Sequence, residues 1–73
     1  MVTFGNRLRE SRKRKNLKQK DVAQHFGIAL RSYQHYEGGQ REPNFSTLVA
    51  LADYFDVTTD YLLGRTDNPA INR

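Results

Sequence analysis

Gly27 is followed by only two residues before a new helical pattern begins, and this spacing limits the fold more than any other feature of the sequence. Residues 19–26 carry an apolar stripe at helical spacing, which consists of Val22, Ala23 and Phe26. Gly27 supplies the left-handed residue that ends such a helix, and Ile28 and Ala29 leave almost no room for a loop. The sequence therefore predicts two helices that meet through a tight turn, at the spacing of a helix-turn-helix motif.

Residues that cap or end helices predict three further helices. The first helix of the chain is expected from about residue 3 to residue 15. The helix after the tight turn ends at Gly38 and Gly39, and Asn44 is the expected cap of the next helix. Thr58 is expected to cap a last short helix that continues to residue 63.

Length and pattern together favour one small all-α domain. Because the 73 residues show no strand alternation, we expect a compact five-helix domain over residues 1–64 and a flexible tail over residues 65–73. The widest apolar stripe is expected to form the core and consists of Phe45, Leu48, Val49, Leu51, Ala52 and Phe55. The last helix has more apolar surface than one small core needs, which predicts a homodimer interface made of Tyr61, Leu62 and Leu63.

Composition disfavours several kinds of site. The chain has no cysteine, which excludes disulfides and Cys-based zinc sites within it. His25 and His35 lack the short spacing of metal ligands, and no nucleophile is paired with a base, so neither a cofactor nor an enzyme is expected. No apolar run approaches the roughly 18 residues of a membrane span, and the N-terminus lacks the order of a signal peptide, so a cytoplasmic location is expected.

The charges of the chain are unevenly distributed. Residues 1–41 hold ten Lys and Arg against three Asp and Glu, whereas residues 42–73 hold two against five. This asymmetry favours a surface that faces a polyanion, either nucleic acid or an anionic membrane, although a solvated basic helix has the same composition. A membrane surface is disfavoured because the basic run over residues 7–20 contains only Leu8 and Leu17 as large apolar residues.

Five short motifs resemble one known family when they are taken in order. They are Gln19-x-x-Val22-Ala23, Gly27 at the turn, Tyr36-Glu37-x-Gly39, Arg41-x-Pro43 and Asp60-Tyr61-Leu62-Leu63-Gly64. Over residues 4–64 this order resembles the Xre-like helix-turn-helix family of phage Cro and repressor proteins. The resemblance implies a lambda-repressor-like fold in which the second helix of the motif enters the major groove of DNA.

Residues for DNA contact are carried over from this resemblance position by position. The positions that match the family's base readers are Leu30, Arg31, Gln34 and His35. Phosphate contacts are expected from Lys18, Gln19, Ser32, Arg41 and Asn44. Independently of the family, a turn of about 100° per residue places Arg31 and His35 opposite the apolar side of their helix, with Gln34 flanking them.

Glu37 lies on the inward side of the same helix, where an unpaired carboxylate is expensive to bury. In resembling proteins this glutamate pairs with the arginine that matches Arg12, so a structural ion pair is expected here. The chain departs from the family at two helix starts, where Lys18 and Ala29 replace the usual Ser or Thr caps. Each missing cap is expected to cost about 1 kcal/mol, and Lys18 is a candidate for a phosphate contact instead.

These observations together predict a sequence-specific transcriptional regulator that binds double-stranded DNA. We expect a repressor that binds an inverted-repeat operator as a homodimer. The alternative is a protein-interaction module, such as an antitoxin or a regulator, whose main partner is another protein.

Overall fold

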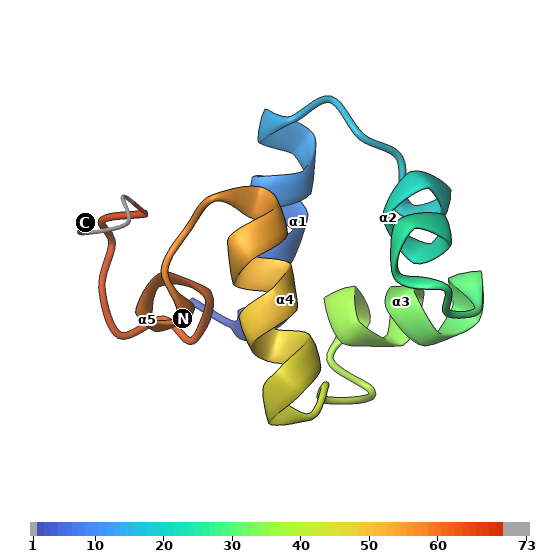
Figure 1. Ribbon diagram of the computed structural model, residues 1–73. Helices are drawn as coiled ribbons and strands as arrows, with labels where there is room; N and C mark the ends of the chain where they lie inside the picture. The colour runs from blue at the N-terminus through green and yellow to red at the C-terminus, as the bar shows by residue number, and fades with distance from the viewer. Residues whose placement is uncertain (1, 70–73) are drawn as a thin grey trace.

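The computed structural model describes residues 2–69, which form five helices and no strand (Figure 1). In chain order they are α1 (Phe4–Arg14), α2 (Gln19–Phe26), α3 (Leu30–Gly38), α4 (Phe45–Phe55) and α5 (Thr59–Leu62). In Figure 1, α2 and α3 lie at one end of the molecule, α5 lies at the other, and α1 and α4 stand between them. The all-α, five-helix architecture is therefore confirmed. No helix in the described part of the chain has the length and apolar character needed to cross a membrane.

Three helix ends that were each predicted from a single capping or terminating residue are confirmed. Gly27 adopts a left-handed conformation with a φ of 66° and ends α2. The side chain of Asn44 accepts a hydrogen bond from the N–H of Thr47 at 2.8 Å, and so caps α4. Thr58 caps α5 in the same way, because its hydroxyl accepts the N–H of Tyr61 at 2.9 Å.

The core is built from residues of all five helices, with the largest share from α4. Its buried apolar residues are Leu8, Val22, Ala23, Tyr33, Leu51, Ala52, Phe55, Val57, Tyr61 and Leu62. The expectation that the whole apolar stripe of α4 is buried is wrong for Phe45, which is 88% exposed, and for Val49, which is 50% exposed. Val49 lies about 110° around the helix from the middle of the buried positions, so the neighbouring helices do not cover it.

Helix α5 contributes more to the core than the sequence predicts. Tyr61 and Leu62 are 2% and 0% exposed, so they have no surface to offer a second copy of the chain. The prediction that these two residues form a dimer interface is therefore wrong. Leu63, which follows the helix, remains 50% exposed.

The described part of the tail returns to the domain. Asp67 forms an ion pair with Arg7, whose side chain is only 8% exposed and whose guanidinium lies 4.2 Å from the centre of the Tyr61 ring. The carbonyl of Pro69 accepts the N–H of Thr58 at 3.3 Å. Residues 65–69 therefore contact α1 and α5, and residues 70–73 of the tail lie outside the described residues.

The packing of α1 against the end of α3 predicts opposite effects for two helical glycines. A Cβ atom at Gly5 would clash with the carbonyl oxygen of Glu37, so α1 would have to move away from α3. We expect Gly5→Ala to lower the free energy of unfolding by about 1–3 kcal/mol, as overpacking does elsewhere. Urea unfolding followed by circular dichroism measures this change.

Gly38→Ala is the matched control, because a Cβ atom there would meet only the movable side chain of Gln40. The control is expected to leave stability unchanged or to raise it by up to about 1 kcal/mol through helix propensity. Equal effects of the two substitutions would contradict the close approach of α1 to α3.

Candidate nucleic-acid interface

Helix α3 buries one side and exposes the other, as the helical wheel predicts. Tyr33 and Glu37 are buried on the inward side. The matched base-reading positions lie outward, with Leu30, Arg31 and Gln34 exposed and His35 half-buried. The turn from α2 into α3 is tight, so the start of α2 and the outward side of α3 lie beside each other at one end of the molecule (Figure 1).

The residues expected to contact phosphate differ in exposure. Lys18, Arg41 and Asn44 are exposed, whereas Gln19 and Ser32 are half-buried. Asn44 uses its side-chain oxygen to cap α4, and the side-chain amide of Gln19 donates to Glu37 at 3.1 Å. The side chains of Asn44 and Gln19 therefore make hydrogen bonds within the fold, in addition to any contact with phosphate.

Arg9 is an exposed cation that the sequence assigns, with Lys13 and Arg14, to a solvated basic face of diffuse attraction to DNA, and its contact with Glu37 was not predicted. Its Nε lies 3.7 Å from Oε1 of Glu37, while its side chain remains 46% exposed. Arg9 and Arg41 line the same hollow of about 530 Å³ between the start of α1 and the end of α3. Because Arg9 precedes Arg12 by three residues, it lies on the same side of α1, and this spacing was the available signal.

The backbone N–H groups at the starts of α2 and α3, where no Ser or Thr caps the helix, have different hydrogen-bond partners. At α2, the carboxylate of Asp21 accepts the N–H of Lys18 at 2.8 Å, which supplies half of a capping box. At α3, Ala29 offers no side-chain hydrogen bond. The first N–H groups of α3 are therefore left for water or for an oxygen of a bound ligand.

The ion pair between Arg12 and Glu37 joins α1 to α3. Nε of Arg12 donates to Oε2 of Glu37 at 2.7 Å, and Nη2 donates to Oε1 at 3.2 Å. Nη1 of Arg12 also donates to the carbonyl of Leu17 at 2.9 Å, in the segment that leads into α2. The Glu37 side chain is 1% exposed, so this carboxylate depends on its protein partners for the interactions that water would otherwise supply.

Burial and hydrogen bonding act on the pKa of Glu37 in opposite directions. Burial favours the neutral acid and would raise the pKa, but hydrogen bonds from Arg12 and Gln19 favour the carboxylate and hold the pKa below its ordinary value of 4.5. The hydrogen bond to Glu37 likewise raises the pKa of Arg12. Glu37 is therefore ionised at neutral pH and acts only as an acceptor.

Gln19 extends this network to the outward side of α3. Its Nε2 donates to Oε1 of Glu37 at 3.1 Å, and its Oε1 accepts from Nε2 of Gln34 at 3.3 Å. One continuous set of hydrogen bonds therefore runs from Arg12, inside the fold, to Gln34 on the exposed side of the helix.

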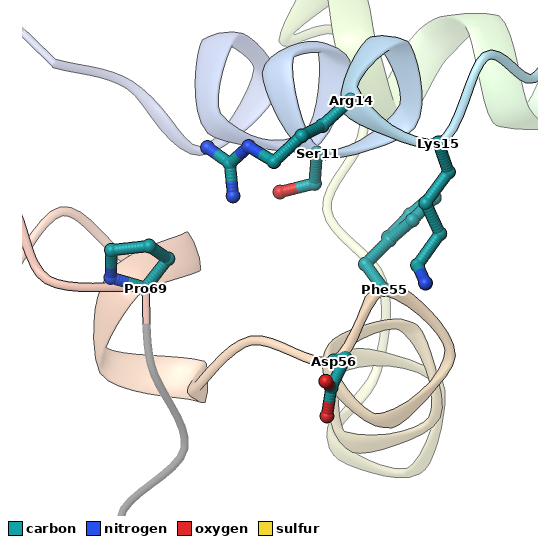
Figure 2. A pocket seen from close by; sticks show the side chains of 6 residues that line it. All are labelled: Ser11, Arg14, Lys15, Phe55, Asp56 and Pro69. Atoms are coloured by element: carbon teal, nitrogen blue, oxygen red, sulfur yellow. The ribbon is translucent and has the colours of Figure 1, made fainter.

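A second hollow, of about 320 Å³, lies between the C-terminal ends of α1 and α4 and the tail (Figure 2). It is lined by Ser11, Arg14, Lys15, Phe55, Asp56 and Pro69. Nη2 of Arg14 donates to the hydroxyl of Tyr61 at 3.0 Å, so this arginine is held against α5. In the part of the chain that the structure describes, no three His, Asp or Glu side chains form a group suited to a metal ion. This hollow shares no residue with the outward side of α3, so it is not part of the candidate interface.

Comparison with known proteins identifies the family. A family model described as "Helix-turn-helix domain" matches residues 5–68. The chain belongs to this helix-turn-helix family. The resemblance to the Xre-like group, inferred from the five motifs, is confirmed by relatives that include phage repressors.

Two curated relatives and one solved structure show how far the similarity extends. The HTH-type transcriptional regulator AnsR of Bacillus subtilis is 48% identical over 60 residues, which are 82% of this chain and 52% of that protein. The cryptic phage CTXphi transcriptional repressor RstR of Vibrio cholerae is 41% identical over 59 residues, which are 81% of this chain and 53% of that protein. The P22 c2 repressor, in a crystal structure with a synthetic operator, matches with a TM-score of 0.79 and 28% identity. That match covers 86% of this chain and 96% of the repressor chain.

The curated relatives are longer proteins. The chain spans 52% of AnsR and 53% of RstR, which is about half of the length of each. The similarity therefore concerns the helix-turn-helix domain that the relatives share with this chain.

The Arg12–Glu37 pair predicts strong coupling between two substitutions. Glu37→Ala is expected to lower the free energy of unfolding by about 3–5 kcal/mol, because it leaves the Arg12 charge without its partner. The double variant, Glu37→Ala with Arg12→Ala, is expected to lose less than the sum of the single losses. A double-mutant cycle measured by urea unfolding tests this, and additive losses would contradict the coupling.

A pH series provides the control for the same pair. Folding lowers the pKa of Glu37 below 4.5, so the ionised carboxylate stabilises the folded state fully above about pH 4.5. This stabilisation is lost as the pH falls through the lower pKa of the folded state. Wild-type stability is therefore expected to fall more steeply below pH 4.5 than that of the double variant. Parallel pH profiles would show that folding does not shift the titration of Glu37.

Proposed function

We propose that the chain is a sequence-specific DNA-binding transcriptional regulator, with α3 in the major groove. The observation that carries the proposal is the two-sided character of α3. Its inward residue Glu37 is fixed by Arg12 and Gln19, while Arg31 and Gln34 on the other side are exposed and polar. Such a helix is both rigidly held and free to make contacts. The similarity to a repressor solved with its operator supports the same function.

The proposed roles of the exposed residues follow from their chemistry. Arg31 has the paired donors that recognise guanine, and Leu30 has the apolar surface that meets the methyl group of thymine. His35 and Gln34 complete the base-reading set. Phosphate contacts are assigned to Lys18, Gln19, Ser32, Arg41 and Asn44. Lys18, Gln19 and Asn44 stand at helix starts, Ser32 lies in the first turn of α3, and Arg41 is an exposed cation in the loop after it.

We propose repression as the outcome of binding. RstR and the P22 c2 protein are both named repressors, and the match to the latter covers nearly all of the solved repressor chain. A protein that occupies an operator can prevent the access of other proteins to that DNA, and this requires no activity beyond binding. The proposal places the protein in the cytoplasm, where bacterial and phage operators are found.

A homodimer is proposed to bind an inverted repeat. Phe45, Val49 and Leu63 leave apolar side chains exposed, and Phe45 and Leu63 line one hollow of about 190 Å³ together with Pro43. Exposed apolar surface of this kind is typical of protein interfaces. Two copies related by a two-fold axis would place their α3 helices in successive major grooves about 34 Å apart.

Removal of the Arg31 side chain and removal of the Arg41 side chain are predicted to weaken DNA binding in different ways. Arg31→Ala should cost about 1–3 kcal/mol on the preferred operator and much less on random DNA, because a base contact carries sequence information. Arg41→Ala should weaken both DNAs by similar factors and reduce the log–log salt slope by about 1 per monomer, as loss of a phosphate contact requires. Fluorescence anisotropy with all single-base operator variants measures both effects.

Two results would count against these roles. Equal loss on every operator variant for Arg31→Ala would show that α3 does not read bases through this residue. A salt slope near zero for the wild-type protein would remove DNA as the partner and favour the protein-interaction module.

The exposed apolar residues predict where the dimer can be weakened. Phe45→Ser and Leu63→Ser should each weaken self-association by about tenfold or more, because each removes apolar area that dimerisation would bury. The thermal midpoint should change little, since both side chains are exposed in the monomer. Gln24→Ser is the control, because Gln24 is exposed on α2, at the other end of the molecule from α5. Sedimentation equilibrium measures the association, and unchanged association in both variants would reject this surface.

A further inference from the structure

The side-chain amides of Gln19 and Gln34 are oriented by the buried charge beside them. The carboxylate of Glu37 can only accept hydrogen bonds, so the group of Gln19 that faces it must be the NH₂. The side-chain carbonyl of Gln19 then faces Gln34, whose NH₂ group donates a hydrogen bond to it at 3.3 Å. Rotation of either amide by 180° would place two oxygens, or two NH₂ groups, against each other.

This orientation decides what Gln34 can offer to a ligand. One N–H of its amide is used by Gln19, which leaves one N–H donor and the carbonyl acceptor, and the side chain is exposed on the outward side of α3. A glutamine without such a restraint can present either two donors or a donor and an acceptor. The contact with Gln19 removes the first possibility.

We propose that Gln34 reads adenine and that Gln19 is the positioning residue that fixes this choice. The inference rests on the proposed entry of α3 into the major groove. Adenine presents one donor, the N6 amine, beside one acceptor, N7, and this pair matches the remaining carbonyl and N–H of Gln34. Guanine presents two neighbouring acceptors, and the second N–H that they require is held by Gln19.

Cytosine and thymine can each make only a single hydrogen bond with the oriented amide. Cytosine offers one donor to the Gln34 carbonyl, and thymine offers one acceptor to its N–H. Adenine is therefore the only base that satisfies both free groups at once. The ion pair of Arg12 with Glu37 strengthens the restraint, because it keeps Glu37 ionised.

The test compares Gln19→Met with Gln24→Met, which is the same substitution at an exposed position of the same helix. Gln34→Ala first identifies the operator position that depends on Gln34. Competition binding then measures the preference for each base at that position. The wild-type protein and Gln24→Met should prefer adenine by about 10-fold or more, as a bidentate contact does. In Gln19→Met the preference should fall to within about threefold, because the freed amide accommodates guanine as well.

The design separates the two proposed roles of Gln19. Loss of a phosphate contact would lower affinity for all operator variants by one common factor, whereas loss of positioning changes the base ratio at one position only. Amide ¹⁵N relaxation of the free protein provides a readout without DNA. The Gln34 side chain should become more mobile in Gln19→Met and remain unchanged in Gln24→Met.

Three results would overturn the inference. They are a preference for a base other than adenine at the Gln34-dependent position, an adenine preference that survives Gln19→Met, and the absence of any position that depends on Gln34. If the wild-type protein prefers no selected sequence over random DNA, the proposed function fails together with the inference. Specific binding without the adenine preference rejects the inference alone.

Discussion

The ion pair between Arg12 and Glu37 is the interaction on which the geometry of the outward face depends. Arg12 belongs to α1, its second contact is the carbonyl of Leu17 before α2, and Glu37 stands near the end of α3. One guanidinium therefore links the first three helices. Removal of either charge would leave the other largely buried and without its main partner, which is among the larger penalties that a single substitution can cause. The backbone of Glu37 also packs against Gly5, so the same point sets how closely α1 approaches α3.

Helix ends could be predicted from the sequence because their chemistry is local. Gly27 ends α2 through its own backbone conformation, and Asn44 and Thr58 cap a helix through an N–H group three residues away. No distant part of the chain can change these interactions. The same reasoning applies to the two sides of α3, since the spacing of Tyr33 and Glu37 alone indicates which side turns inward. The exposed positions of Arg31 and Gln34 follow from this spacing.

The features that sequence reasoning missed depend on how helices cross. The wheel of α4 shows a broad apolar stripe, but only the crossing of neighbouring helices decides that Phe45 and Val49 stay outside the core. Tyr61 is buried because Arg7 and Arg14 of α1 lie against its ring, a contact between residues far apart in the sequence. The hydrogen bond between Gln19 and Gln34 likewise requires the angle between α2 and α3. The sequence contains these residues, but their distances are set only when the helices pack.

The separation of charge along the chain is only partly reproduced in space, because Arg7 pairs with Asp67 and Arg65 pairs with Asp60 near α5. Lys18, Lys20 and Arg31 lie at or beside the starts of α2 and α3, whereas Asp60 and Asp67 lie in α5 and the tail at the other end of the molecule (Figure 1). Exposed positive charge at one end of a molecule draws that end toward a polyanion before contact is made. For the proposed function, the end that carries the starts of α2 and α3 would therefore face the DNA. The charges that attract the protein would then lie beside the proposed base-reading residues of α3, so attraction and recognition would act at the same end of the molecule.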